Sequence, residues 1–303
     1  MVANSYRLSA QESTPVLVED YQEDTLVFPG NSNANNLMQL IEQKEYKKYV
    51  LEFHKTYQSD SSKENNYKAD LYNLACAYTK LKNYDKAFNT LKVLSDKLRF
   101  DDAYVLGDYD LEPLHGDKRW IEFEKEIRLN YLAKNKNITH PELAIKLSTW
   151  AGIDQTYIRL TQTVNGRTKF RQKNRALVDS LVVIFEVYGY PTPKMVGAEA
   201  YVPALIIAHA EYGTQLMYRE FLYREGIKGN IPSGMAGVVI DKILVKQGKP
   251  QLYGTQGCYD SVSKRTLPCP IQDIEHLEER RREMGFLMSW EAYVKLQESL
   301  NEQ

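Results

Sequence analysis

The chain has 303 residues, of which 43% are apolar and 26% are charged, and its formal net charge at pH 7 is −1. This composition is typical of a folded protein with two domains, and the balanced charge argues against a dominant polyanionic partner such as nucleic acid. No apolar run reaches the roughly 18 residues that would span a bilayer, and the N-terminal residues show no signal-peptide pattern.

Hydrophobic periodicity predicts a mainly α-helical protein with three parts along the chain. Residues 1–30 are acidic and lack clear periodicity, so we expect an irregular N-terminal segment there. Residues 31–128 predict paired helices, and residues 129–303 predict an irregular α-helical domain with a small non-helical flap.

The paired helices are clearest before residue 95. Short helices are expected at 36–42 and 45–57, with a polar break between them. Both helices of the next pair carry apolar residues at helical spacing. These are Leu71, Leu74, Ala75 and Tyr78 in the first helix, and Ala87, Leu91 and Leu94 in the second. The small residues Ala75 and Ala87 allow two antiparallel helices to approach closely.

This region, about 36–128, resembles a tetratricopeptide repeat array. The residues that match the family spacing are Leu74, Ala75, Tyr78 and Ala87. Leu71 replaces the usual Trp, and the closing Pro is absent. The stretch 108–120 resembles the ending of such arrays, in which Leu111, Leu114 and Trp120 would cover the last open helix face. The resemblance implies a protein or peptide partner for this region.

Longer helices without a repeat are expected in the rest of the chain. They are placed at 141–163, 173–188, 198–224, 233–246, 273–284 and 289–300. Ser289 is the expected N-cap of the last helix, and Gly189 is an expected helix stop. The polar stretch between Cys258 and Cys269 predicts a hairpin or an irregular flap.

Cysteine usage bears on the cellular compartment. Cys258 and Cys269 could pair in an exported protein, but the small number of cysteines favours two free thiols in a reducing cytosol. A cytoplasmic location is therefore favoured, and export with a signal already removed stays open.

Several polar side chains in helical segments are candidates for binding or catalysis. His209 lies on an apolar stripe, where it is either a hydrogen-bonded core histidine or an acid–base group at the floor of a pocket. Asp241 stands in the apolar run 235–245, as a salt-bridged residue or a general base. Gln155 and Arg159 are four residues apart and share a helix face, where they could hold an anion or form a solvated pair.

The segment 248–257, with the sequence Gly-Lys-Pro-Gln-Leu-Tyr-Gly-Thr-Gln-Gly, directly follows the apolar helix. Tyr253, Thr255 and Gln256 supply a phenol, a hydroxyl and an amide beside glycine-flanked backbone. This combination predicts a loop that binds a small polar ligand. Arg281 is expected to hold an anionic group of that ligand together with Arg159.

Residues of about 140–303 resemble an uncharacterised bacterial family, a domain of unknown function that often follows tetratricopeptide repeats. The resemblance rests on motifs in a fixed order. They are Asp154-Gln155 with Arg159, Gly189-Tyr190-Pro191, His209-Ala210, Asp241, the segment 251–256, and Arg280-Arg281 with Gly285. The family usually has Trp at Tyr190 and Asp at Glu211. The resemblance implies no known activity.

Two functions follow from these patterns. One is a helical domain with a polar small-ligand pocket, fused to a protein-binding repeat region and acting as a hydrolase or transferase, with His209 or Asp241 as general acid or base. The other is a non-catalytic adaptor or sensor whose two domains both bind protein. No zinc, phosphate-loop or dinucleotide motif is present, so no metal and no cofactor is expected.

Overall fold

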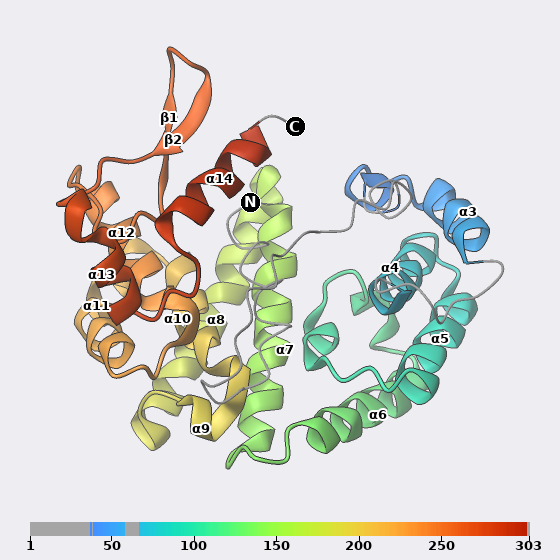
Figure 1. Ribbon diagram of the computed structural model, residues 1–303. Helices are drawn as coiled ribbons and strands as arrows, with labels where there is room; N and C mark the ends of the chain where they lie inside the picture. Colours follow the sequence, from blue (N-terminus) through green and yellow to red (C-terminus); the bar gives the residue numbers. More distant parts are fainter. Residues whose placement is uncertain (1–36, 38, 58–66, 302–303) are drawn as a thin grey trace. The chain divides into compact units, whose positions relative to one another are not determined.

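The computed structural model describes residues 37, 39–57 and 67–301, and it divides the chain into two units between residues 136 and 137 (Figure 1). The expected domain boundary after residue 128 falls inside α6 (Lys118–Lys134), a continuous helix that ends shortly before this division. The irregular segment expected at 1–30 lies outside the described residues.

The N-terminal unit is built from helical hairpins. α3 (Tyr46–Thr56) packs on α4 (Tyr67–Lys80), and α4 packs on α5 (Tyr84–Lys92). The side chain of Asn83 accepts a hydrogen bond from the Lys86 amide and begins α5 after the tight turn. All the apolar residues that the helical spacing singled out are buried, so the expected hairpin is confirmed: Leu71, Leu74, Ala75, Tyr78, Ala87, Leu91 and Leu94.

The regular hairpin pattern stops after α5. The chain widens into the π-helix η1 (Val93–Lys97) and then forms the 3-10 helices η2 (Ala103–Gly107) and η3 (Glu112–Leu114). The side-chain amide of Asn130 on α6 donates to the carbonyls of Ser95 and Phe100. These bonds satisfy backbone groups that the irregular turn leaves without helical partners. Leu111, Leu114 and Trp120 are buried in this part of the unit.

Buried tyrosine hydroxyls hold this unit together. Tyr49 donates to the backbone carbonyl of Asp70 at 2.8 Å, and Tyr57 donates to the Asp70 carboxylate. Tyr72 donates to the carboxylate of Asp108, and burial raises the pKa of the Tyr72 phenol well above its ordinary value. Each carboxylate is therefore buried with a donor, which offsets the cost of removing it from water.

The C-terminal unit is an irregular helical domain around α10 (Val202–His209), and every residue of α10 from Val202 to Ala208 is buried. α10 packs against α7 (Pro141–Tyr157), α8 (Val164–Tyr188), α11 (Tyr212–Ile227) and α12 (Met235–Lys246). The last helices are α13 (Leu277–Glu283) and α14 (Trp290–Asn301). Shorter elements connect these helices: the 3-10 helices η4 (Ile158–Gln162), η5 (Gly197–Tyr201), η6 (Pro232–Gly234) and η7 (Ile274–His276), and the single-turn α9 (Pro193–Val196). The expected mainly α fold is confirmed, and among the described residues no helix is long and apolar enough to cross a membrane.

One long helix expected from the sequence is divided in the structure. The helix placed at 198–224 breaks after His209, where Ala210 is extended at φ −71° and ψ 170°, and α11 begins at Tyr212. The break is stable because the side-chain amide of Gln215 donates to the carbonyls of both Ala208 and Ala210. His209 is thus the last residue of a buried helix, and Leu216, which was expected on the same stripe, is 40% exposed. The expected helix stop is present at Gly189, where a positive φ of 67° ends α8. The expected N-cap is present at Ser289, whose hydroxyl accepts a hydrogen bond from the Ala292 amide.

The non-helical flap is an antiparallel hairpin of β1 (Gly257–Asp260) and β2 (Arg265–Pro268). Figure 1 shows it extending away from the helices of its unit. The expectation of free thiols is wrong, because Cys258 and Cys269 form a disulfide at the base of the hairpin. The strand register pairs Cys258 with Leu267 and brings the two cysteine Cα atoms to 4.9 Å, within reach of a bond.

We expect the disulfide to hold the hairpin and not the helical body. Replacing both Cys258 and Cys269 with serine should accelerate amide hydrogen exchange across 257–268, because an isolated two-stranded hairpin is only marginally stable. The amides of α10 should keep their protection in the same experiment. Unchanged protection of the hairpin in the double variant would contradict this role.

Candidate functional site

A carboxylate–imidazole pair lies at the centre of the C-terminal unit. The Asp154 carboxylate on α7 accepts a hydrogen bond from Nδ1 of His209 at 2.7 Å. The Asp154 side chain is 0% exposed, whereas that of His209 is 13% exposed. The pair therefore runs from the core to a position that solvent reaches through the imidazole.

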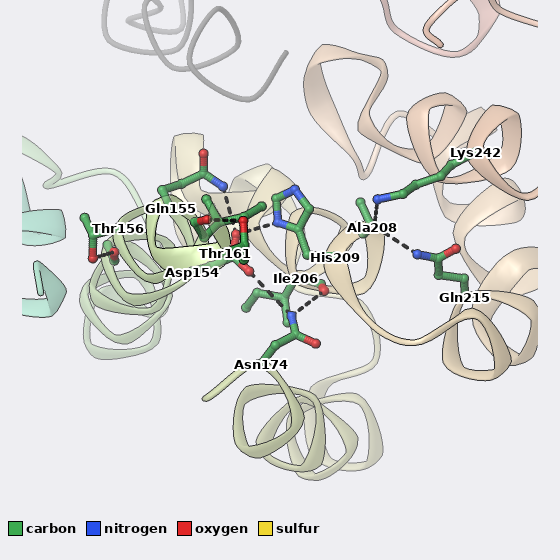
Figure 2. Close-up of polar contacts among 12 residues, drawn as sticks. Asp154, Gln155, Thr156, Thr161, Asn174, Ile206, Ala208, His209, Gln215 and Lys242 are labelled. Carbon is green, nitrogen blue, oxygen red and sulfur yellow. Dashed lines mark hydrogen bonds and ion pairs between the residues drawn. The ribbon is translucent and has the colours of Figure 1, made fainter. Parts of the chain in front are cut away.

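Two amides complete the hydrogen bonding of the Asp154 carboxylate. Nε2 of Gln155 donates to Oδ2 at 2.8 Å, and Nδ2 of Asn174 on α8 lies 3.5 Å from Oδ1. Asn174 also donates to the Ile206 carbonyl at 3.0 Å. Figure 2 shows that these donors surround the carboxylate from three helices. A buried carboxylate needs such donors to stay ionised in a low-dielectric core.

This arrangement assigns the proton on the imidazole. Because the surrounding amides all donate to Asp154, its oxygens act as acceptors and Nδ1 of His209 carries the hydrogen. In the neutral ring, Nε2 is then the basic nitrogen. Figure 2 shows Nε2 directed away from Asp154, and the carbonyl oxygen of Gln155 also points away from the carboxylate. The geometry can orient an imidazole to take up a proton.

Lys242 of α12 reaches the same region. Its Nζ donates to the Ala208 carbonyl at 2.6 Å, one residue before His209 (Figure 2). Burial lowers the pKa of Lys242, and the nearby Lys246 ammonium acts in the same direction, while the Asp154 carboxylate acts to raise it. The lysine is therefore partly desolvated and electrostatically linked to the Asp154–His209 pair.

A second polar cluster surrounds Asp241, the residue before Lys242. Its fully buried carboxylate accepts hydrogen bonds from the backbone amides of Leu252, Tyr253 and Thr255 at 2.7–3.2 Å. The Thr255 hydroxyl donates to the same carboxylate at 3.0 Å. Burial raises the pKa of Asp241, and these donors act to lower it. Backbone amides and a hydroxyl thus take the place of the basic partner that the sequence suggested.

Other side chains of the same segment also act within the fold. Gln251 is buried and bonds the backbone of both Gln256 and Cys269. Nη1 of Arg281 donates to the Tyr253 carbonyl at 2.6 Å, and its guanidinium covers the Phe286 ring. Gly254 has a φ of 73°, and a Cβ there would lie 2.5 Å from the Trp290 ring. The glycine is therefore required by both conformation and space.

The residues proposed from the sequence as one site are divided between these two clusters. His209 and Gln155 lie with Asp154. The phenol of Tyr253 is buried and stacks on Phe286 at 5.9 Å. Thr255, Gln256 and Arg281 lie with Asp241, where the Gln256 amide donates to the Thr255 hydroxyl. Arg159 is exposed on η4, because the chain tightens to a 3-10 helix after Tyr157 and takes Arg159 out of the α-helical spacing with Gln155.

Sequence reasoning assigned no role in the site to Asn174 or Lys242. Asn174 lies in the basic stretch 166–175, and Lys242 follows the more conspicuous Asp241. Asp154 stood in a recognised motif, but its burial could be learned only from the fold. The signal for Asn174 and Lys242 was weak: each is a polar residue within the helical spacing of buried neighbours, Leu177 and Val239 among them.

The described residues contain no group of three or more His, Cys, Asp and Glu side chains placed to hold a metal ion.

Asp241 should be essential to stability. Asp241→Ala removes the acceptor for three buried amides, so we expect a loss of at least about 3 kcal/mol in the free energy of unfolding. Asp241→Asn keeps one carbonyl oxygen and should lose less. Chemical denaturation of the full chain measures both, with the exposed Asp179→Ala on α8 as the matched control. Equal stability of the Asp241→Ala and Asp179→Ala variants would exclude the proposed anchoring role.

Comparison with known proteins assigns the domain that contains the Asp154 and Asp241 clusters to a protein family. The model of a family of unknown function, DUF6624, matches residues 137–301, which is more than half of the chain and coincides with the C-terminal unit. No curated protein and no solved structure matches the chain. The chain therefore belongs to the DUF6624 family of unknown function.

Proposed function

We propose that the C-terminal domain binds a small polar compound beside His209 and acts on it as a hydrolase or transferase. The single observation that supports this most strongly is the fully buried Asp154 carboxylate, 2.7 Å from Nδ1 of a partly exposed imidazole. A carboxylate in this position orients the ring and stabilises the imidazolium that forms when Nε2 takes a proton.

The neighbouring groups have complementary roles in this proposal. Nε2 of His209 is the general base that removes a proton from water or from a substrate hydroxyl. Gln155 presents its side-chain oxygen beside the ring and positions the ligand. Asp241 has no catalytic role, because its carboxylate oxygens are occupied by the 252–255 backbone and the Thr255 hydroxyl.

A non-catalytic adaptor or sensor is the second candidate. It is favoured by the internal use of Tyr253, Thr255 and Arg281, which leaves fewer polar groups for a substrate than the sequence suggested. In that case the Asp154–His209 pair would serve only to join α7 to α10. The two candidates differ in whether His209 is needed for turnover.

For the N-terminal unit we propose protein or peptide binding of the kind found in tetratricopeptide arrays. The supporting observation is an apolar strip on α6, where Ile121 and Leu129 are 67% and 50% exposed. Glu124, Lys125 and Arg128 lie in the same surface depression, where Arg128 pairs with Glu124 at 3.9 Å. The apolar strip and the Lys125 ammonium together suit a peptide with apolar side chains and an acidic neighbour.

The catalytic proposal is tested by a thermal-shift screen of the full chain against a metabolite library, because a ligand that binds the native state raises its apparent stability. Stabilising compounds are then followed for consumption by mass spectrometry. His209→Gln should lower turnover by about a hundredfold or more, and Asp154→Asn should also lower it. His276→Gln is the control, because His276 is exposed and bonds only its neighbour Asp273.

Two outcomes would reject catalysis. One is equal turnover by the His209→Gln and His276→Gln variants. The other is the absence of any consumed compound among those that bind the wild-type chain, which would leave the sensor as the better description.

The proposal for the N-terminal unit is tested with peptides selected from a display library on the full chain. Replacing both Ile121 and Leu129 with glutamate should abolish binding measured by calorimetry, because it removes the apolar contacts and repels acidic neighbours. Leu51→Glu is the control, since Leu51 is 62% exposed on α3. Retained binding in the double variant, with the control unchanged, would place the peptide site elsewhere.

A further inference from the structure

Lys242 has an unusual position for a lysine. Its side chain is half-buried, and its ammonium reaches the end of α10, where it donates to the Ala208 carbonyl at 2.6 Å. Removing an ammonium group from water is costly unless the group is well compensated. The role of Lys242 therefore needs an explanation beyond its place on a helix.

Capping the end of α10 does not supply that explanation. The carbonyl of Ala208 already accepts a hydrogen bond from Nε2 of Gln215 at 2.9 Å, and Gln215 also satisfies Ala210. Lys242 is a second donor to an oxygen that is already bonded. An ammonium has three donors, and the described part of the chain shows a partner for one of them.

The charges around Lys242 are also unevenly distributed. Lys246 lies one turn further along α12, with its ammonium 4.5 Å above the Tyr212 ring. The Asp154 carboxylate, which acts on Lys242, is bonded to His209 and two amides. Glu211, two residues after His209, is paired with Arg175 of α8 at 3.1 Å. Asp154 therefore attracts the Lys242 ammonium from a distance, but among the described residues no carboxylate contacts this ammonium directly.

We infer that Lys242 binds an oxyanion group, a carboxylate or a phosphate, of the compound on which His209 acts. The anion would replace the water lost by the ammonium and hold the reacting bond beside Nε2 of the imidazole. This inference rests on the proposed function for the reacting bond, but binding of the anion itself requires no turnover.

The test is a titration of the full chain with inorganic phosphate and, separately, with acetate, at constant ionic strength maintained with chloride. The readout is the NMR signal of the His209 ring, which is assigned by its loss in His209→Gln. We expect a saturable shift with at least one of the two anions, and the anion that binds identifies the group. In Lys242→Met, which keeps most of the apolar stem, the affinity should fall by about tenfold or more, equivalent to at least about 1.4 kcal/mol.

Two further variants separate charge from packing. Lys249→Met removes an exposed lysine from the same region of the chain and should bind the anion like the wild type. Lys242→Arg keeps a cation, so it should retain anion binding if Lys242→Met loses binding because its charge is removed. The Lys242→Arg variant also tests the role of the charge if Lys242→Met is poorly folded. The inference would be overturned if both Lys242 variants bound the anion like the wild type. It would also be overturned if neither phosphate nor acetate gave a saturable shift in the wild type.

The outcome is independent of the test for catalysis. If phosphate or acetate binds through Lys242 while His209→Gln turns over substrate normally, the anion site stands and general-base catalysis fails. If His209 is required for turnover but neither anion binds, the catalytic proposal stands and the role of Lys242 fails.

Discussion

The C-terminal domain depends on the burial of one carboxylate, that of Asp154. An ionised group in a helical core needs several donors, and here they come from α7, α8 and α10 in the form of Gln155, Asn174 and His209. The three helices are therefore held in register by a polar contact that apolar packing alone would not specify. The same contact fixes the orientation and the tautomer of the imidazole, which is the most exposed of the three donors.

α12 connects this pair to the loop that follows it. Its adjacent residues Asp241 and Lys242 are separated by about 100° around the helix axis, so their side chains meet different neighbours. Asp241 gathers the backbone amides of 252–255, and Lys242 reaches the end of α10. One helix thus secures a structural loop with one residue and contributes to the candidate site with the next. The polar segment 251–256 therefore stabilises the fold through Asp241, while the neighbouring Lys242 lies beside the imidazole of His209.

The break between α10 and α11 is a further consequence of this arrangement. A continuous helix would have used the carbonyls of Ala208 and Ala210 within its own backbone. Because the helix ends at His209, these oxygens are available to side chains, and Gln215 and Lys242 bond them. The exposed end of a buried helix is where a side chain can be held rigidly by the core and still contact a ligand.

Elements with local signals could be predicted from the amino-acid sequence. Helical spacing located the hairpin of α4 and α5 and most helices of the C-terminal domain, because an amphipathic helix must bury one face wherever it packs. Glycine at 189 and serine at 289 marked helix ends for similarly local reasons. Periodicity also identified His209 as an inward-facing residue, and the composition of 257–268 indicated a non-helical flap.

The contacts of the polar residues could not be predicted in this way, because they depend on the packing of distant segments. Nothing local to Asp154, Asn174 and His209 shows that they meet, since they lie on three helices and are joined by packing across the core. The same holds for Asp241, whose partners turned out to be backbone amides, which every residue except proline carries and which no side-chain pattern reveals. The bonding of Cys258 to Cys269 likewise followed from the strand register. Pairings between distant groups depend on the compact arrangement of the whole domain, and that arrangement separated the Tyr253 loop from the imidazole.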